Sequence, residues 1–173
     1  MIKVKIRKWE DTLVSELVIK TFKESDYPAV IKYCLPEEQA IYTSLPIDVI
    51  EEFKKDQYNQ PFIVVYEGDL VGCFALYTNN RGNIYTNNEN SIIFKSFSID
   101  SRFQRKGFAL NVLKLLPTIT KQHYPEKNEI ILTVHHTNIA AINLYIKAGF
   151  KEQELRFEGE YGEEIIFHFD LAV

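Results

Sequence analysis

The chain has 173 residues and a mass of 20.2 kDa, which is the usual size of one domain. Hydrophobic residues make up 46% of it and charged residues 25%, the balance of a folded globular protein, and this excludes collagen-like, disulfide-scaffold and intrinsically disordered classes. With 20 basic against 24 acidic residues the net charge is -4, so the chain lacks the basic excess that is typical of nucleic-acid binding. We expect no nucleic-acid partner.

The start of the chain and the cysteines indicate a cytoplasmic protein. Residues 1–8 alternate charged with apolar side chains and lack the apolar segment of a signal peptide. No run approaches the roughly 18 apolar residues of a membrane span, so no membrane partner is expected. Cys34 and Cys73 lie far apart without CxxC spacing, and we expect two reduced thiols rather than a disulfide.

Alternating and helical patterns predict the elements of the first third of the chain. Residues 2–8 and 17–22 are typical of strands, and Glu10-Asp11-Thr12 indicates a hairpin turn between them. A helix is expected over residues 25–35, and a second over residues 46–56.

The middle of the chain predicts a hairpin and a central strand. Residues 62–66 and 70–77 flank a Glu-Gly-Asp turn. The asparagine-rich stretch 78–90 predicts a loop, because asparagine favours turns. Residues 91–99 carry apolar side chains on both faces near their start, which indicates a central strand.

Helices and strands alternate in the last third. Residues 107–116 have the spacing of a buried helix face, and Pro117 is expected to end or kink that helix. Residues 138–148 predict a helix with Asn138 at its start and Gly149 just past its end. Further strands are expected at residues 129–134, 150–157 and 163–171. This order favours a single α/β domain around one mixed sheet.

The most informative segment is residues 96–109, where the central strand ends and a helix begins at a glycine-containing turn. The first amides of a helix have no acceptor within the helix and lie at the positive end of its dipole, so such a site binds phosphate. Gly107 and Ala109 allow a ligand to approach the backbone, and Arg105 and Lys106 add positive charge. The alternative is an ordinary loop with a solvated basic pair.

A second informative segment is the helix at residues 138–148. It places Asn138 and Tyr145 about two turns apart, and therefore on one face. The alternative is that Asn138 only caps the helix and that Tyr145 only packs.

Together the two segments resemble the GNAT N-acetyltransferase superfamily. Residues 104–109 match its Q/R-x-x-G-x-G/A acyl-CoA pyrophosphate loop, and residues 138–150 match its second signature, Asn-x-x-Ala-x-x-Leu-Tyr-x-Lys-x-Gly-Phe. The expected elements from Leu17 to Leu171 follow the order of the family. The resemblance implies a mixed, mostly antiparallel sheet flanked by helices, with residues 17–173 as the N-acetyltransferase domain and residues 1–16 as an extension that has room for an extra strand.

The resemblance also implies acetyl-CoA as co-substrate and direct transfer of the acetyl group to an amine. The backbone of Phe97 and Ile99 would pair with the pantetheine arm, and the amides of residues 105–109 would hold the pyrophosphate. Tyr145 matches the tyrosine that family members use as the general acid toward the leaving thiolate. The cofactor-binding residues so implied are Phe97, Ile99, Gln104, Arg105, Lys106, Gly107, Phe108, Ala109 and Asn138.

The sequence does not identify the general base. Many relatives carry a glutamate on the central strand where this chain has Lys95, which leaves His135 through water, Glu38 or no single residue as the base. Glu38 lies between the first two expected helices, where the family builds its acceptor pocket, and a solvated helix start is the alternative. His135 and His136 lack a third ligand at suitable spacing, so no metal is expected.

We expect an N-acetyltransferase that acts on a small primary amine, with a polyamine as the leading candidate. A protein N-terminal or lysine acetyltransferase is one alternative. A non-catalytic acyl-CoA-binding domain is another, because Lys95 replaces the usual acid. A homodimer is one assembly state open to such a domain.

Overall fold

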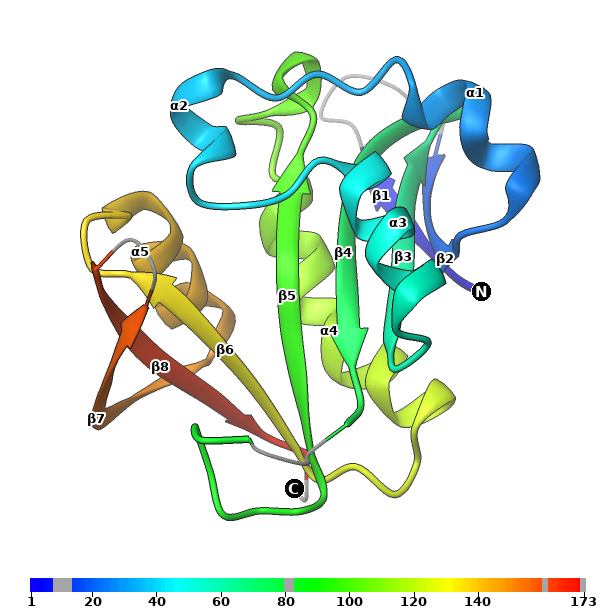
Figure 1. Ribbon diagram of the computed structural model, residues 1–173. Coiled ribbons are helices and arrows are strands. Elements are labelled where there is room, and N and C mark those ends of the chain that lie inside the picture. Colours follow the sequence, from blue (N-terminus) through cyan, green and yellow to red (C-terminus); the bar gives the residue numbers. More distant parts are fainter. Residues whose placement is uncertain (8–13, 80–82, 160–161, 172–173) are drawn as a thin grey trace. The chain divides into compact units, whose positions relative to one another are not determined.

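Strands and helices of the computed structural model follow the expected α/β order (Figure 1). The structure describes residues 1–7, 14–79, 83–159 and 162–171. The strands are β1 (Ile2–Arg7), β2 (Val14–Thr21), β3 (Asn59–Tyr66), β4 (Asp69–Tyr77), β5 (Ser91–Ile99), β6 (Glu129–His135), β7 (Lys151–Gly159) and β8 (Gly162–Asp170). The helices are η1 (Glu24–Asp26), α1 (Tyr27–Val30), α2 (Glu37–Ala40), α3 (Pro46–Lys55), η2 (Ser101–Phe103), α4 (Phe108–His123) and α5 (Ile139–Ala148).

The sheet has the strand order β1-β2-β3-β4-β5-β6-β8-β7. β5 and β6 run parallel, whereas the pairs β1–β2, β2–β3, β6–β8 and β7–β8 are antiparallel. The predicted α/β fold with a mixed, mostly antiparallel sheet and flanking helices is therefore confirmed.

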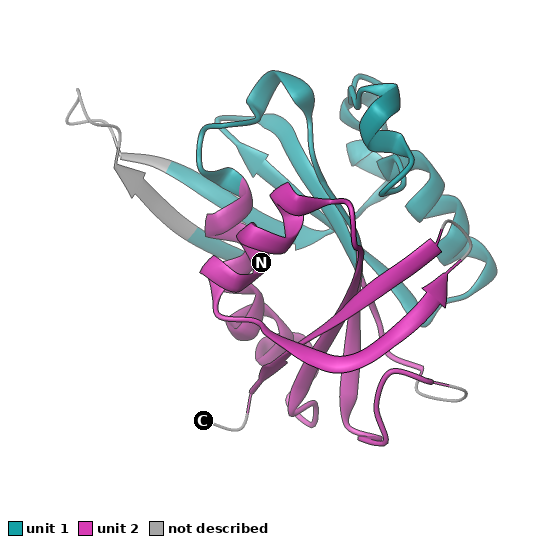
Figure 2. Ribbon diagram, turned by 90° about the vertical axis from the view of Figure 1, so that its left-hand side faces the viewer, with its two compact units in different colours: residues 1–75, 96–108 teal, residues 76–95, 109–173 magenta. Residues whose placement is uncertain are grey.

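Packing divides the chain into two compact units (Figure 2). Unit 1 comprises residues 1–75 and 96–108, and unit 2 comprises residues 76–95 and 109–173. β4, β5 and α4 each begin in one unit and end in the other, as expected for parts of one domain.

The strands at the start of unit 1 agree with the sequence patterns. β1 and β2 confirm the strands expected at residues 2–8 and 17–22, and β2 begins earlier than expected. The turn predicted at Glu10-Asp11-Thr12 lies outside the described residues. Between β3 and β4, Glu67 (φ 51°) and Gly68 (φ 90°) are both left-handed, as in the tight turns that suit the twist of a hairpin.

The first expected helix, residues 25–35, is wrong in length. α1 ends at Val30, and the chain then runs without regular structure to α2. The reason is long-range pairing: the Tyr33 hydroxyl lies 2.8 Å from Ser98 Oγ, and the Cys34 amide donates to Asp100. α3, in contrast, has the expected bounds within one residue and packs against β3 (Figure 1).

α4 continues past Pro117 to His123, so of the two outcomes expected for Pro117, an end or a kink of this helix, the end is wrong. A proline inside a helix removes one hydrogen bond and costs about 3 kcal/mol or more. Ile119, which follows it, is almost fully buried. The burial of this apolar side chain offsets much of that cost and favours a helical second half of α4.

Residues 83–90 of the asparagine-rich stretch form the expected loop, and polar contacts hold it within unit 2. Asn88 Nδ2 donates to Asn128 Oδ1 at 2.8 Å and to Glu129 Oε2 at 2.9 Å. Tyr85 packs edge-on against Phe157. The start of β6 therefore anchors this loop.

Both cysteines are free thiols, as expected; Cys34 is exposed and Cys73 is buried. Burial raises the pKa of the Cys73 thiol to about 12, so the thiol stays protonated at neutral pH.

Within the described residues, no helix combines the length and the apolar character needed to cross a membrane.

Candidate active site

A glycine-containing loop leads from the end of β5 to α4. Arg105 (φ 59°) and Gly107 (φ 81°) both take the left-handed conformation, which turns the chain into the helix. A side chain at Gly107 would meet no heavy atom within 4 Å, so the backbone there is open to a ligand. α4 begins at Phe108, and the amides of its first turn have no acceptor within the helix. This backbone suits an anionic group such as a pyrophosphate.

The side chains of this loop differ in what they contact. Arg105 and Lys106 are exposed, and Lys106 Nζ lies 5.1 Å from the centre of the Phe103 ring. Phe108 is buried and packs on Tyr66, with ring centres 4.8 Å apart. The side chain of Phe108 therefore belongs to the core of unit 1, and only the backbone of this residue is left for a ligand.

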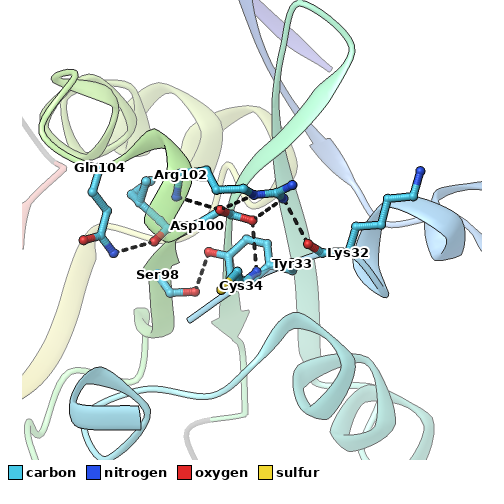
Figure 3. A network of polar contacts seen from close by, with 8 residues as sticks. Lys32, Tyr33, Cys34, Ser98, Asp100, Arg102 and Gln104 are labelled. Carbon is cyan, nitrogen blue, oxygen red and sulfur yellow. Dashed lines mark hydrogen bonds and ion pairs between the residues drawn. The ribbon is translucent and has the colours of Figure 1, made fainter. Parts of the chain in front are cut away.

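The Gln104 side chain joins three elements of unit 1. Its Nε2 donates to the Ile99 carbonyl at 2.9 Å and to Gln39 Oε1 at 2.7 Å. Figure 3 shows Gln104 turned toward the end of β5. The motif predicts Gln104 as a cofactor-binding residue. Its side chain forms hydrogen bonds within the protein, and these bonds position the loop.

Asp100 forms a hydrogen-bonded centre at the end of β5 (Figure 3). Its fully buried carboxylate accepts from Arg102 Nε at 2.9 Å, from the Arg102 guanidinium NH2 at 2.6 Å and from the Arg102 amide at 2.9 Å. The Cys34 amide donates to it at 3.0 Å. The Arg102 guanidinium also donates to the Lys32 carbonyl at 3.0 Å. Asp100 and Arg102 thereby tie residues 32–34 to the start of the phosphate loop.

The ionisation of Asp100 reflects these contacts. Burial acts against the charged form, but the hydrogen bonds from Arg102 and from the Cys34 amide outweigh it and hold the pKa of Asp100 below its usual range. Sequence reasoning missed this residue. The available signal was an aspartate directly after a central strand, where its side chain can cap the turn that follows.

Replacing Asp100 with asparagine should destabilise the protein by about 2–3 kcal/mol, because one amide cannot accept all of these donors. For a chain of this size that corresponds to a Tm lower by roughly 4–12 °C. Since the pKa of Asp100 is lowered on folding, its contribution is complete at neutral pH and is lost as the pH falls through its folded-state value.

Thermal melts of the parent and Asp100→Asn at pH 7 and in acid would test this. The difference in Tm should shrink in acid. Asp48→Asn on the exposed side of α3 is the control and should change stability by less than about 1 kcal/mol. An Asp100→Asn Tm equal to that of the parent at pH 7 would contradict the expected role.

The end of β5 has an irregular backbone. Ser96 is left-handed (φ 54°) within the strand, immediately before Phe97. Thr43 Oγ1 donates to the Phe97 carbonyl at 3.2 Å, and the Ile99 carbonyl accepts from Gln104. No sequence pattern indicates a left-handed serine in a strand, so Ser96 and Thr43 were not among the predicted site residues.

In unit 2, α5 carries Asn138 and Tyr145 as the sequence predicts. Asn138 Oδ1 accepts from the Ala141 amide at 3.2 Å, so this side chain caps the helix. Tyr145 is 8% exposed, and its ring packs on those of Phe150 and Phe167. Burial raises the pKa of the Tyr145 phenol, which keeps the phenol protonated at neutral pH.

His135, one of the candidates for the general base, has another contact, and so do His136 and Lys95, which were not base candidates. His135 Nδ1 lies 2.7 Å from Thr137 Oγ1, and His136 contacts the Glu163 carbonyl at 3.1 Å. Lys95 Nζ lies 6.0 Å from the centre of the Tyr77 ring.

In the part of the chain that the structure describes, no cluster of three or more potential metal-ligating side chains occurs.

Glu38 lies on α2 in unit 1 and is exposed, as is its neighbour Glu37. Gln39, which follows, contacts Gln104, so α2 lies beside the carboxyl end of β5 (Figure 1). The structure thus brings the predicted acceptor segment to the predicted phosphate loop within unit 1.

Comparison with known proteins agrees with these features. The acetyltransferase (GNAT) family matches residues 27–150, which include both motif segments. The chain belongs to this family. The predicted acyltransferase enzyme is confirmed, in place of a non-catalytic acyl-CoA-binding domain.

Several relatives of this acetyltransferase cover most of its length. The uncharacterized N-acetyltransferase YbbJ of Bacillus subtilis is 29% identical over 157 residues, which are 90% of this chain and 98% of the relative. The spermine/spermidine N(1)-acetyltransferase of Bacillus subtilis is 33% identical over 143 residues, which are 82% of this chain and 93% of the relative.

Solved structures show the same fold. An aminoglycoside acetyltransferase, AAC(6')-Ib, in complex with coenzyme A and kanamycin has a TM-score of 0.72 at 16% identity and covers 89% of this chain and 94% of its own. The spermidine N-acetyltransferase of Vibrio cholerae, in complex with CoA and spermine, has a TM-score of 0.68 at 20% identity. The match covers 90% of this chain and 96% of the chain of that enzyme. Both of these neighbouring structures contain CoA.

Proposed function

We propose that this acetyltransferase transfers the acetyl group of acetyl-CoA directly to a primary amine of a polyamine. The observation that carries the proposal is the similarity to a spermine/spermidine acetyltransferase over most of that enzyme's length.

The surface of α2 and the residues after it supports a polyamine. Glu37 and Glu38 are exposed carboxylates, and Ile41 and Tyr42 are 60% and 41% exposed. Carboxylates attract the ammonium groups of a polyamine, apolar side chains suit the methylene chains between them, and an aromatic ring attracts a cation. Such a mixed surface fits an aliphatic polyamine better than it fits a fully polar acceptor.

In the proposed reaction the backbone binds the cofactor and side chains move the protons. The amides of residues 105–109 bind the pyrophosphate, and the backbone of Phe97 and Ile99 holds the pantetheine arm. The amine nitrogen attacks the thioester carbonyl, the C–S bond breaks, and Tyr145 donates its proton to the departing thiolate. The proton that the attacking nitrogen loses as the amide forms restores the phenol of Tyr145. The amine must first lose a proton, because its reference pKa is near 10.4, and His135 through water, Glu38 or solvent accepts it. The buried, protonated thiol of Cys73 is a poor nucleophile, which favours direct transfer.

CoA release from acetyl-CoA, measured with a panel of amines, tests the proposed function. The panel contains spermine, spermidine, putrescine, kanamycin and a lysine-containing peptide. We expect kcat/KM for spermine or spermidine to exceed that for the other acceptors by at least about tenfold. A higher value for the peptide or for kanamycin would overturn the polyamine assignment, and no release with any amine would overturn the proposed activity.

Replacing Glu38 with glutamine should raise the KM for spermidine about 1.4–5-fold at low ionic strength, since an exposed charge pair is worth about 0.2–1 kcal/mol. The increase should disappear near about 1 M salt, where charges are screened within about 3 Å. Glu126→Gln, an exposed site just beyond α4, is the control and should leave KM unchanged. A Glu38→Gln variant with the parent's KM at low salt would remove Glu38 from the acceptor site.

A further inference from the structure

The side chains of Gln39 and Gln104 join α2 to the loop that begins α4. Gln104 Nε2 donates to Gln39 Oε1 at 2.7 Å, and Gln39 Nε2 donates to Gln104 Oε1 at 3.3 Å, although the residues are 65 positions apart. Both side chains are half-buried, so water competes with them only in part. The two amides form a reciprocal pair within unit 1.

The Ile99 carbonyl sets the direction of this pair. It accepts the other N–H of the Gln104 amide at 2.9 Å. Because a carbonyl oxygen only accepts, the Gln104 nitrogen must face Ile99, and Gln104 Oε1 is left for Gln39. A rotated Gln104 amide would place two oxygens together. The end of β5, the phosphate loop and α2 therefore share one arrangement of hydrogen bonds.

Both segments that this pair joins need support from outside themselves. Arg105, directly after Gln104, is left-handed, which costs a residue with a Cβ about 1–2 kcal/mol. α2 is a single turn whose first residue has no side-chain cap, and helices this short are not stable alone. Thr43, just after α2, adds a second contact through the Phe97 carbonyl.

We infer that Gln39 is a positioning residue that couples ligand binding at the phosphate loop to the ordering of α2, and through α2 to the acceptor amine. The inference rests on the proposed function, in which the loop binds the pyrophosphate of CoA and α2 contacts the amine. A ligand that holds the Gln104 side chain in one conformation stabilises the hydrogen bonds between Gln104 and Gln39. By reciprocity, an ordered α2 strengthens CoA binding by the same factor.

Hydrogen exchange with CoA as the probe tests the coupling directly. In the parent, CoA should slow the exchange of the amides of residues 37–43 by at least about fivefold, the lower range of allosteric coupling. In Gln39→Ala this slowing should fall below about twofold, while the amides of residues 104–110 remain protected. Gln39→Glu retains an acceptor for Gln104 and should keep part of the effect. Gln122→Ala, an exposed glutamine on α4, should behave as the parent.

Kinetics provide a second readout. At saturating acetyl-CoA, Gln39→Ala should raise the KM for spermidine about 5–10-fold with kcat within about twofold of the parent. The Gln39→Ala/Gln104→Ala double variant should show no further increase over Gln104→Ala, because the two residues act through one contact.

The outcomes separate the two proposals. If CoA protects residues 37–43 as strongly in Gln39→Ala as in the parent, the coupling role of Gln39 is overturned, while the CoA site stands. If CoA protects neither segment in the parent, the proposed function fails and the inference fails with it.

Discussion

Tyr145→Phe is expected to lower kcat by about 10²–10⁴-fold, the usual contribution of a positioned general acid. Burial raises the pKa of the Tyr145 phenol, so the hydroxyl is fully protonated at neutral pH and still carries the proton that the leaving thiolate needs. Phenylalanine keeps the packing on Phe150 and Phe167 and removes only the hydroxyl. Stability and acetyl-CoA affinity should therefore change little, and the loss should appear in kcat.

Steady-state rates combined with single-turnover measurements would check this expectation while chemistry limits the rate. Tyr85→Phe, at a half-buried tyrosine that packs on Phe157, is the matched control and should stay near the parent rate. If Tyr145→Phe turns over within about threefold of the parent, well short of the usual effect, Tyr145 is a packing residue and another donor protonates the sulfur.

The pH profile offers an independent check on Tyr145. Because the phenol pKa is raised above its reference of about 10, loss of its proton should not lower kcat at any pH below about 10. The rate should instead rise with pH as more of the acceptor amine loses its proton. A decline in kcat between about pH 8 and 9, present in the parent and absent in Tyr145→Phe, would contradict the raised pKa.

Gly107→Glu is expected to abolish the thermal stabilisation by acetyl-CoA. A ligand at 100-fold over its Kd adds about 2.7 kcal/mol to the free energy of unfolding, and this raises the Tm of a chain of this size by roughly 5–11 °C. The backbone at Gly107 is open to solvent, so a glutamate there would place its carboxylate where the phosphates are expected and would repel them.

Two further variants separate charge from backbone strain at this position. Gly107 is left-handed (φ 81°), so any side chain with a Cβ adds strain, and asparagine tolerates this conformation better than alanine does. Gly107→Asn and Gly107→Ala should lower the Tm of the unliganded protein slightly and keep most of the shift with acetyl-CoA. Thermal melts with and without acetyl-CoA measure this. A full shift in Gly107→Glu would place the pyrophosphate elsewhere.

Local patterns in the sequence determined most of the elements and the family. The cap at Asn138, the glycine at position 149 and the hairpin around Gly68 each depend on residues within a few positions, and the structure has each of them as predicted. The motifs at residues 104–109 and 138–150 led to the acetyltransferase family for the same reason. These features depend on the backbone preferences of single residues and on spacings of a few positions along the chain. Both can be read from a single sequence.

Long-range contacts and burial were decided only by the tertiary structure. α1 stops at Val30 because Cys34 is held by Asp100, 66 positions away. α4 passes Pro117 because the residues after it are buried. The motif predicted Gln104, but its partner Gln39 is 65 positions earlier and carries no pattern of its own. Hydrogen-bond partners and pKa shifts depend on which distant groups meet and how much water is excluded, and neither follows from residue spacing along the chain.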